Sequence, residues 1–530
     1  MAECVNSKGG ENNMKKLRSF FVLAAAAAAL VLFLFPGTEI KAAGTATLNS
    51  AVIQGNQVVV TGTASVASED GILHLYAQDP YESGAQGIEV AQAPNGTASF
   101  TFSLNKNSAN SNLFKKFTVV AIQNGIPTAV SNSVYITNPE AAATHTAARR
   151  DGGIKGILPA AQLLNANNLT DLGVHQATYN LLLGRITTGG GIDYQYNGKT
   201  WHFNAQVVSE YDTVARRLND QGIQVTFIVL NDLGADPTLI HPLARDGVAA
   251  NYYALNAADQ AGVEKLAAVA SFLGQRYSNT GHGTVDNWII GNEVNARQPW
   301  NYMQSSNVNQ YAAEYAKAFR IMYNGLKSEN ANAQVYVATD QQWAVASNAS
   351  QYYGSRPFLV AFNDYIRSEG NIDWRLSSHP YNVPLYDPNN WTPTGYATHS
   401  QSSRYVTMQN IDVITDFLSQ PELLSPSGNV RSLKLSEVGY TSSAGEQQQA
   451  IAVTYAYLQA ISNRYVDGLI ISREMDEAVE IAQGMAVGLL NGSAQPKMAY
   501  DFYKHAGDPN YLAQASAMAG VDLTSRITVR

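Results

Sequence analysis

The sequence predicts an α/β protein in which a (β/α)8 barrel follows a small all-β sandwich. Residues 45–138 alternate apolar and polar side chains, with breaks at Gly, Asn and Ser, which is typical of antiparallel strands. From residue 154 onward, short apolar runs alternate with amphipathic helical stretches, as in parallel βα units. A chain of 530 residues also suits a barrel of ~250 or more residues plus an accessory domain.

Residues 1–44 are typical of an export signal. Three positive charges at residues 15–18 precede the continuous apolar stretch 20–35, and the small residues 42–44 offer a cleavage site. We therefore expect a secreted, extracellular bacterial protein, although the nineteen residues 17–35 are long enough to remain as a membrane anchor. A polar stub precedes Met14, which indicates that Met14 is the true start and that the upstream start is mis-assigned.

The composition of the chain narrows the class of partner. Charged residues make up 14% and aromatic residues 10%, including 29 Tyr, which suits neutral ligands rich in hydroxyl groups. The net charge of −8 and the lack of a basic cluster argue against binding of nucleic acid through phosphate contacts. We expect a monomer with no stable membrane association after signal cleavage.

Sequence motifs for metals and cofactors are missing. The only cysteine, Cys4, lies in the N-terminal stub, so the mature chain has no disulfide, thiol nucleophile or cysteine-ligated metal. The nine histidines show no HExxH spacing, and no Gly-rich phosphate loop precedes a helix. We therefore expect neither a metal nor a cofactor.

The sandwich is expected over residues 45–138, as about seven short strands that resemble an immunoglobulin-like module. We favour a role as a spacer or prop over carbohydrate binding, which stays open. Residues 139–153 have no helix or strand period and form a linker.

The barrel domain is expected over residues 154–515. The apolar runs predict eight strands near 154–158, 174–182, 223–230, 285–291, 334–339, 373–379, 431–437 and 466–473. Amphipathic periodicity predicts helices over 204–221, 257–278, 305–329, 403–420 and 446–463, and one more after residue 496.

Two of these strands each end on a glutamate. The apolar run Trp288-Ile289-Ile290 stops at Gly291-Asn292-Glu293, and the run that begins at Leu433 ends in Glu437. In (β/α)8 barrels the catalytic groups lie at the carboxyl ends of the strands. The sequence therefore predicts that Glu293 and Glu437 share one site.

Together with His379-Pro380-Tyr381 at the end of another strand, these segments resemble clan A of the retaining glycoside hydrolases, which are TIM barrels. The resemblance implies that Glu293 is the general acid/base and Glu437 the nucleophile. It also implies that Asn292 binds the 2-hydroxyl of the sugar and that Tyr381 donates its hydroxyl to Glu437. His379 either contacts substrate or is a core histidine. The barrel is also similar to an uncharacterised bacterial domain family related to this clan.

Further substrate contacts are expected on the loops that follow the strands. Four of the six tryptophans fall there, and sugar stacking by one or two of them is favoured over mere pinning of the loops, with Trp300 and Trp391 preferred over Trp201 and Trp343. Asn295, on the loop of Glu293, is a candidate contact. Where the clan carries Trp at the end of the last strand, this chain has Arg473, a candidate for a polar contact.

The function predicted from these residues is a secreted retaining glycoside hydrolase that cleaves a β-linked poly- or oligosaccharide by double displacement. Two alternatives stay open: a barrel that binds glycan without cleaving it, and a transglycosylase that uses the same residues. A retaining enzyme predicts carboxyl groups ~5 to 5.5 Å apart, whereas an inverting one predicts ~6.5 to 9.5 Å.

Overall fold

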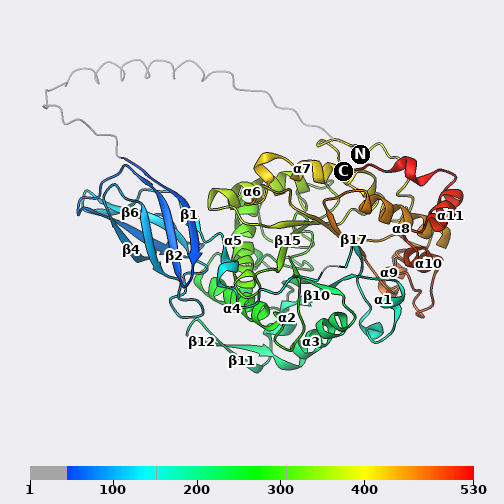
Figure 1. Cartoon of the computed structure of the whole chain (residues 1–530), viewed down its shortest axis with the longest axis horizontal. Coiled ribbons are helices and arrows are strands. Elements are labelled where there is room, and N and C mark those ends of the chain that lie inside the picture. Colours follow the sequence, from blue (N-terminus) through cyan, green and yellow to red (C-terminus); the bar gives the residue numbers. More distant parts are fainter. Residues whose placement is uncertain (1–43, 151, 306) are drawn as a thin grey trace, which may run out of the picture. The chain divides into compact units, whose positions relative to one another are not determined.

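The computed structural model describes residues 44–150, 152–305 and 307–530, and residues Thr45–Arg530 form one compact unit. The predicted start at Met14 and the signal segment before residue 44 lie outside the described residues. Two antiparallel sheets followed by a closed barrel of eight parallel strands confirm the predicted fold class (Figure 1). In the part of the chain that the structure describes, no helix combines the length and apolarity needed to cross a membrane.

The sandwich consists of a three-stranded and a five-stranded antiparallel sheet. The first has the order β1 (Ala46–Gln54), β2 (Gln57–Ala64), β5 (Ser99–Ser103). The second has the order β4 (Ile88–Pro94), β3 (Ile72–Gln78), β6 (Lys116–Gln123), β7 (Ile126–Ala129), with β8 (Val134–Tyr135) also paired to β6. Alternate residues point inward, so that Phe102 and Phe117 meet in the core with ring centroids 5.1 Å apart.

All eight predicted barrel strands are present, and every neighbouring pair in the barrel is parallel. They are β9 (Lys155–Ile157), β10 (Gln176–Leu182), β13 (Gln224–Leu230), β14 (Asn287–Ile290), β15 (Gln334–Thr339), β16 (Arg375–Ser378), β17 (Leu433–Val438) and β18 (Val466–Ile471). Between β10 and the next barrel strand, the hairpin of β11 (Gly191–Tyr196) and β12 (Lys199–Asn204) extends from the barrel.

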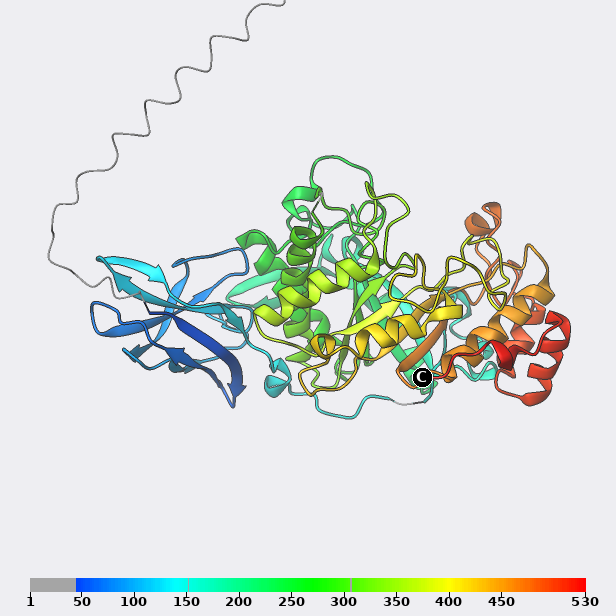
Figure 2. The ribbon, with the colours of Figure 1, turned by 90° about the horizontal axis from the view of Figure 1, so that it is seen from above.

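Helices surround these strands (Figure 2). The long ones are α3 (Ala205–Asp220), α4 (Gln260–Arg276), α5 (Val308–Lys327), α6 (Ser355–Ser368), α8 (Glu446–Ile461) and α11 (Pro509–Ala519). The short ones are α1 (Asn168–Asp171), α2 (Leu183–Thr187), α7 (Asp412–Leu418), α9 (Ala478–Ala482) and α10 (Met498–Lys504).

Two helix predictions need correction. Only α7 and a preceding 3₁₀ turn, Met408–Asn410, form within the helix expected over 403–420, because Thr407 is extended and caps that turn in a capping box with Asn410. No helix was expected between the fifth and sixth strands, yet α6 lies there and buries Phe358, Leu359, Phe362 and Ile366 along one face.

The linker closes the N-terminal end of the barrel. Arg149 donates to Asn287 Oδ1 over 2.7 Å and to the Gln334 side chain, and Arg150 pairs with Asp286 over 3.1 Å. Asn287 and Gln334 are the first residues of β14 and β15. The opposite end of the barrel is therefore the one left for a site.

The sandwich packs on the outer helices of the barrel. Lys106 pairs with the buried Glu329 over 3.1 Å, and Asn324 donates to the Leu113 carbonyl over 2.9 Å. The guanidinium of Arg320 lies 4.8 Å from the centre of the Tyr135 ring. These contacts hold the sandwich against α5 and the turn that follows it.

A buried ion pair lies inside the barrel between neighbouring strands. Lys434 Nζ is 3.1 Å from Asp467 Oδ1 and donates to Gln176 Oε1 over 2.6 Å. Burial lowers the pKa of Lys434. Burial alone would raise the pKa of Asp467, but the Lys434 cation and hydrogen bonds from Ser432 and Tyr336 lower it to about 2. The pair is therefore ionised and links β10, β17 and β18.

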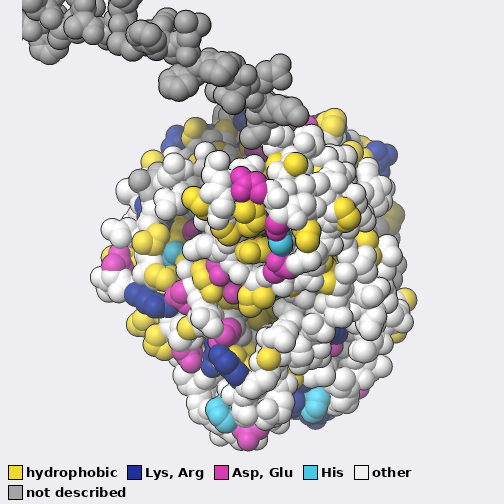
Figure 3. All heavy atoms as spheres, turned by 90° about the vertical axis from the view of Figure 1, so that its left-hand side faces the viewer, with side chains coloured by type: hydrophobic (Ala, Val, Ile, Leu, Met, Phe, Trp, Pro, Cys, Tyr) yellow, Lys and Arg dark blue, Asp and Glu magenta, His cyan; other side chains and the backbone are white. Residues whose placement is uncertain are grey.

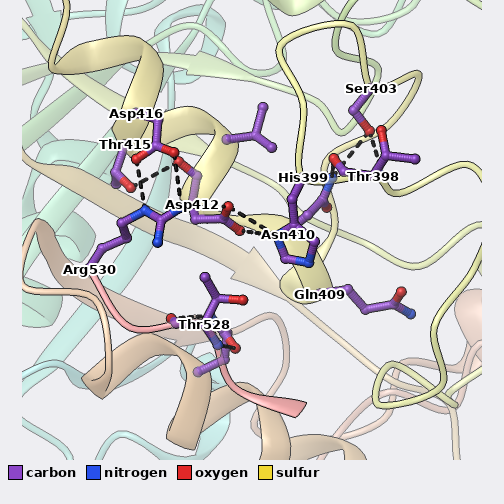
Figure 4. A network of polar contacts seen from close by, with 12 residues as sticks. Thr398, His399, Ser403, Gln409, Asn410, Asp412, Thr415, Asp416, Thr528 and Arg530 are labelled. Carbon is purple, nitrogen blue, oxygen red and sulfur yellow. Dashed lines mark hydrogen bonds and ion pairs between the residues drawn. The ribbon is translucent and has the colours of Figure 1, made fainter.

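The C-terminal residue is tied to α7. Arg530 Nε is 2.8 Å from Asp416 Oδ1, and Arg530 Nη2 is 3.3 Å from Asp412 Oδ2. His399 Nδ1 is 2.9 Å from Asp412 Oδ1 (Figure 4). On the face shown in Figure 3, charged side chains are scattered among uncharged ones, in keeping with the low content of charge.

Candidate active site

Glu293 lies on a strained loop directly after β14. Gly291 has a φ of 82° and Glu293 itself a φ of 39°, in the left-handed region that a residue with a side chain rarely adopts. The Val294 N–H donates to the Ala338 carbonyl over 2.9 Å, and the Tyr311 hydroxyl donates to the Val294 carbonyl over 2.7 Å. Strain of this kind persists where surrounding contacts enforce it, and it concentrates at functional sites.

Glu437 lies within β17, and the barrel brings it to Glu293. One carboxylate oxygen of each glutamate and a ring nitrogen of His379 all lie within 4.8 Å of one another. This separation fits the ~5 to 5.5 Å of carboxyl pairs that react by double displacement better than the ~6.5 to 9.5 Å of inverting pairs. Both glutamates are partly exposed, and His379 is buried between them.

His379 bridges the two carboxylates. Its Nδ1 is 2.9 Å from Glu293 Oε1 and 3.6 Å from Glu437 Oε2, and its Nε2 is 2.9 Å from Ser436 Oγ. Burial alone would lower the pKa of His379, but the charge of Glu437, the hydrogen bond to Glu293 and its charge raise it. With 0% of its surface exposed and both nitrogens engaged, His379 orients the carboxylates, which favours the core histidine of the two alternatives left open by the sequence.

Tyr381 holds the second glutamate. Its hydroxyl donates to Glu437 Oε2 over 3.2 Å and lies 2.8 Å from Ser472 Oγ, the residue that follows β18. Burial and the charge of Glu437 raise the pKa of Tyr381 well above its usual value, so the hydroxyl keeps its proton and remains a donor.

The two asparagines of the loop behave differently. Asn292 is 9% exposed, and no hydrogen bond joins its amide to another side chain or backbone group within the described ranges. Asn295 is 0% exposed, and its amide donates to Asp340 Oδ1 over 2.6 Å and to the Tyr353 carbonyl over 3.0 Å. The prediction that Asn295 contacts substrate is therefore wrong, because the protein itself uses both ends of its side chain.

The two tryptophans predicted to stack on sugar differ in exposure. Trp391 is 8% exposed and packs in the hydrophobic core, so its ring faces are covered, which corrects its proposed role in sugar stacking. Trp300 is half-buried and lies 5.8 Å from the Tyr252 ring. Burial and then the charge of Glu437 raise the pKa of Tyr252.

Arg473 lies at the end of β18 next to the same centre. It pairs with Glu480 over 2.5 Å, and although burial lowers the pKa of Arg473, the charge of Glu480, the hydrogen bond to it and then the charge of Glu437 raise it. Arg473 and Glu480 line a cavity of about 510 Å³, together with Tyr179 and Asn180 of β10. Asp476 forms a buried ion pair with Lys497 over 3.0 Å, so this acid stabilises the fold.

Sequence reasoning missed four residues of the site: Ser436, Ser472, Tyr252 and Asp340. Asp340 directly follows β15 and is 4% exposed. Burial and the charge of Glu293 raise its pKa to about 7. A polar residue at the carboxyl end of a predicted barrel strand was an available signal for Asp340 and for Ser472. Tyr252 lies on a long loop, where its sequence position gave no such signal.

Comparisons with known proteins give one family model and several structures that are similar to this chain. The model of the family of unknown function DUF5722 matches residues 147–527. A search of curated proteins gives no match. A family 39 glycoside hydrolase from Bacteroides cellulosilyticus WH2 is similar, with 13% identity, a TM-score of 0.46, and coverage of 88% of this chain and 83% of that chain. The GH5_18 structure from Streptomyces cattleya in complex with GlcNAc has 12% identity, a TM-score of 0.45, and coverage of 68% and 80%. Since its model spans most of the chain, the protein belongs to the DUF5722 family.

Proposed function

We propose that the protein is a retaining glycoside hydrolase that cleaves a β-linked poly- or oligosaccharide with Glu293 and Glu437. The observation that carries the proposal is the meeting of these two carboxylates within 4.8 Å at the carboxyl ends of the barrel strands. Each is partly exposed, so a ligand can reach it. Tyr381 orients Glu437 and His379 orients Glu293 through hydrogen bonds.

The reaction proceeds in two displacements. Glu437 attacks the anomeric carbon while Glu293 transfers its proton to the glycosidic oxygen, so that the leaving sugar departs and an ester of Glu437 forms. Glu293, now ionised, removes a proton from water, and the water oxygen attacks the same carbon. The bond to Glu437 breaks, the configuration is retained and Glu293 is protonated again. The mechanism needs no metal or cofactor.

Other side chains suit a neutral sugar. The free amide of Asn292 can bond to the 2-hydroxyl in the cleaving subsite, an interaction that strengthens in the transition state. Trp300 with Tyr252 offers an aromatic surface for stacking. The Arg473–Glu480 pair presents both donors and acceptors to hydroxyl groups in the adjoining cavity. We further propose that the protein is secreted as a monomer and that the sandwich props the barrel.

The test is a screen of the protein that begins at residue 45 on aryl β-glycosides and polysaccharides. Glu437→Gln and Glu293→Gln are measured beside a matched control, Glu264→Gln, which lies on α4 and pairs with Lys199. The proposal expects the first two variants to lose orders of magnitude in rate and the control to keep its rate. Binding of a glycan with no turnover by the wild type would support a non-catalytic binder, and products longer than the substrate would support a transglycosylase.

A further inference from the structure

A third carboxyl group, that of Asp340, lies behind the proposed acid/base. It is 4% exposed and follows β15, the neighbour of β14, after which the loop of Glu293 begins. Its acceptors are used by neutral donors: Oδ1 accepts from the Gln342 N–H over 2.9 Å, and Oδ2 accepts from the Gln342 amide over 2.8 Å. A buried carboxyl with neutral partners and no role in the fold's ion pairs calls for an explanation.

Asp340 is joined to the loop of Glu293 by a reciprocal pair of hydrogen bonds. Asn295 Nδ2 donates to Asp340 Oδ1 over 2.6 Å, and the Asp340 N–H donates to Asn295 Oδ1 over 2.9 Å. Asn295 comes two residues after Glu293, whose backbone is left-handed. The pair therefore closes the strained turn from its far side and fixes the direction in which Glu293 points.

The charge that acts on Asp340 is that of the proposed acid/base, Glu293. Burial first, and then the charge of Glu293, raise the pKa of Asp340 to about 7, while hydrogen bonds from Asn295 and Gln342 oppose the rise. Asp340 in turn contributes to the raised pKa values of His379 and of Tyr352. The negative charge of Glu293 therefore disfavours the ionised form of the buried Asp340.

We propose that Asp340 is a positioning residue for Glu293, whose loop it holds through the reciprocal hydrogen bonds with Asn295. The inference rests on the proposed function of Glu293. It adds a residue that touches neither the sugar nor the scissile bond.

The first experiment compares the pH dependence of kcat/KM for the wild type, Asp340→Asn and a matched control, Asp412→Asn. Asp412 is equally buried but pairs with Arg530 and His399, outside the site. Because Asp340 is expected to titrate near pH 7 while it holds the loop of Glu293, the wild-type profile should bend near pH 7, and this limb should be lost in Asp340→Asn. The control keeps its profile. A uniform fall in rate with an unmoved limb would overturn the inference and leave only a structural role.

The second experiment needs neither a substrate nor a folded Asp340 variant. Carboxyl ¹³C NMR follows the titration of Asp340 in the wild type and in Glu293→Gln. We expect Asp340 to titrate near pH 7 in the wild type and at lower pH in the variant. The same midpoint in both proteins would contradict the pairing. A shift with no turnover on any glycoside would count against the hydrolase while supporting the pairing of the two carboxyls.

Discussion

Replacement of Tyr381 by Phe removes the hydrogen bond to the proposed nucleophile and the contact with Ser472. The Tyr381 hydroxyl donates to Glu437 Oε2 over 3.2 Å and contacts Ser472 Oγ over 2.8 Å. In the second displacement Glu437 leaves the sugar as a carboxylate, so this bond gains strength as charge returns to the oxygen. The variant should therefore slow hydrolysis of the glycosyl ester more than its formation.

The size of the effect follows from the geometry. A hydrogen bond to a charged group contributes about 1.5–3 kcal/mol. Because 3.2 Å is longer than the usual O–H···O range of about 2.5–3.0 Å, the lower end applies. About 1.5 kcal/mol corresponds to about a tenfold loss in kcat.

The assay is release of an aryl leaving group, followed from the first turnover to the steady state. Tyr381→Phe should show a lower kcat, a lower KM and a burst of aryl alcohol, because the ester accumulates. Tyr511→Phe is the matched control, since its hydroxyl also donates to a carboxylate, that of Asp501, on α10. Wild-type kcat without a burst in Tyr381→Phe would refute the reasoning.

Three further predictions concern stability. Lys434→Met leaves Asp467 buried without its cation and should cost about 3–5 kcal/mol of unfolding free energy, measured by urea denaturation. An unchanged midpoint would contradict the ionised pair. The pKa of Asp467 in the folded state, about 2, lies below its ordinary 3.8, so its contribution of about 2 kcal/mol is present above pH 4 and is lost as the pH falls toward 2. Thermal melts should show this loss of stability at acid pH in the wild type and not in Asp467→Asn. Lys106→Met leaves Glu329 buried and unpaired, which should loosen the sandwich by about 3 kcal/mol and speed its cleavage in limited proteolysis, whereas equal cleavage rates would argue against a tight interface.

The sequence predicted the barrel because its strands are buried on both faces and appear as continuous apolar runs. The run Trp288-Ile289-Ile290 and the run from Leu433 both have this form, and the turn residue Gly291 marks where the first one stops. Once the strands are parallel and closed, their carboxyl ends must meet. The juxtaposition of Glu293 and Glu437 was therefore predictable from topology alone.

The direction of loop side chains was not predictable in this way. Trp391 and Asn295 lie on the predicted loops, but tertiary contacts turn both into the protein. Asp340 was missed because its position in the sequence does not by itself mark it as part of the site. It looks like an ordinary strand end in sequence, and only the packing of β15 against the loop of Glu293 gives it a neighbouring charge.

Trapping of the covalent ester tests the central claim most directly. The probe is the 2,4-dinitrophenyl 2-deoxy-2-fluoro-β-glycoside of the sugar that the glycoside panel identifies, and the readout is intact mass followed by peptide mapping. The proposed mechanism predicts the mass of one fluoroglycosyl unit on Glu437 in the wild type and none in Glu437→Gln. An adduct on another residue, or steady turnover of the parent glycoside with no adduct, would contradict it.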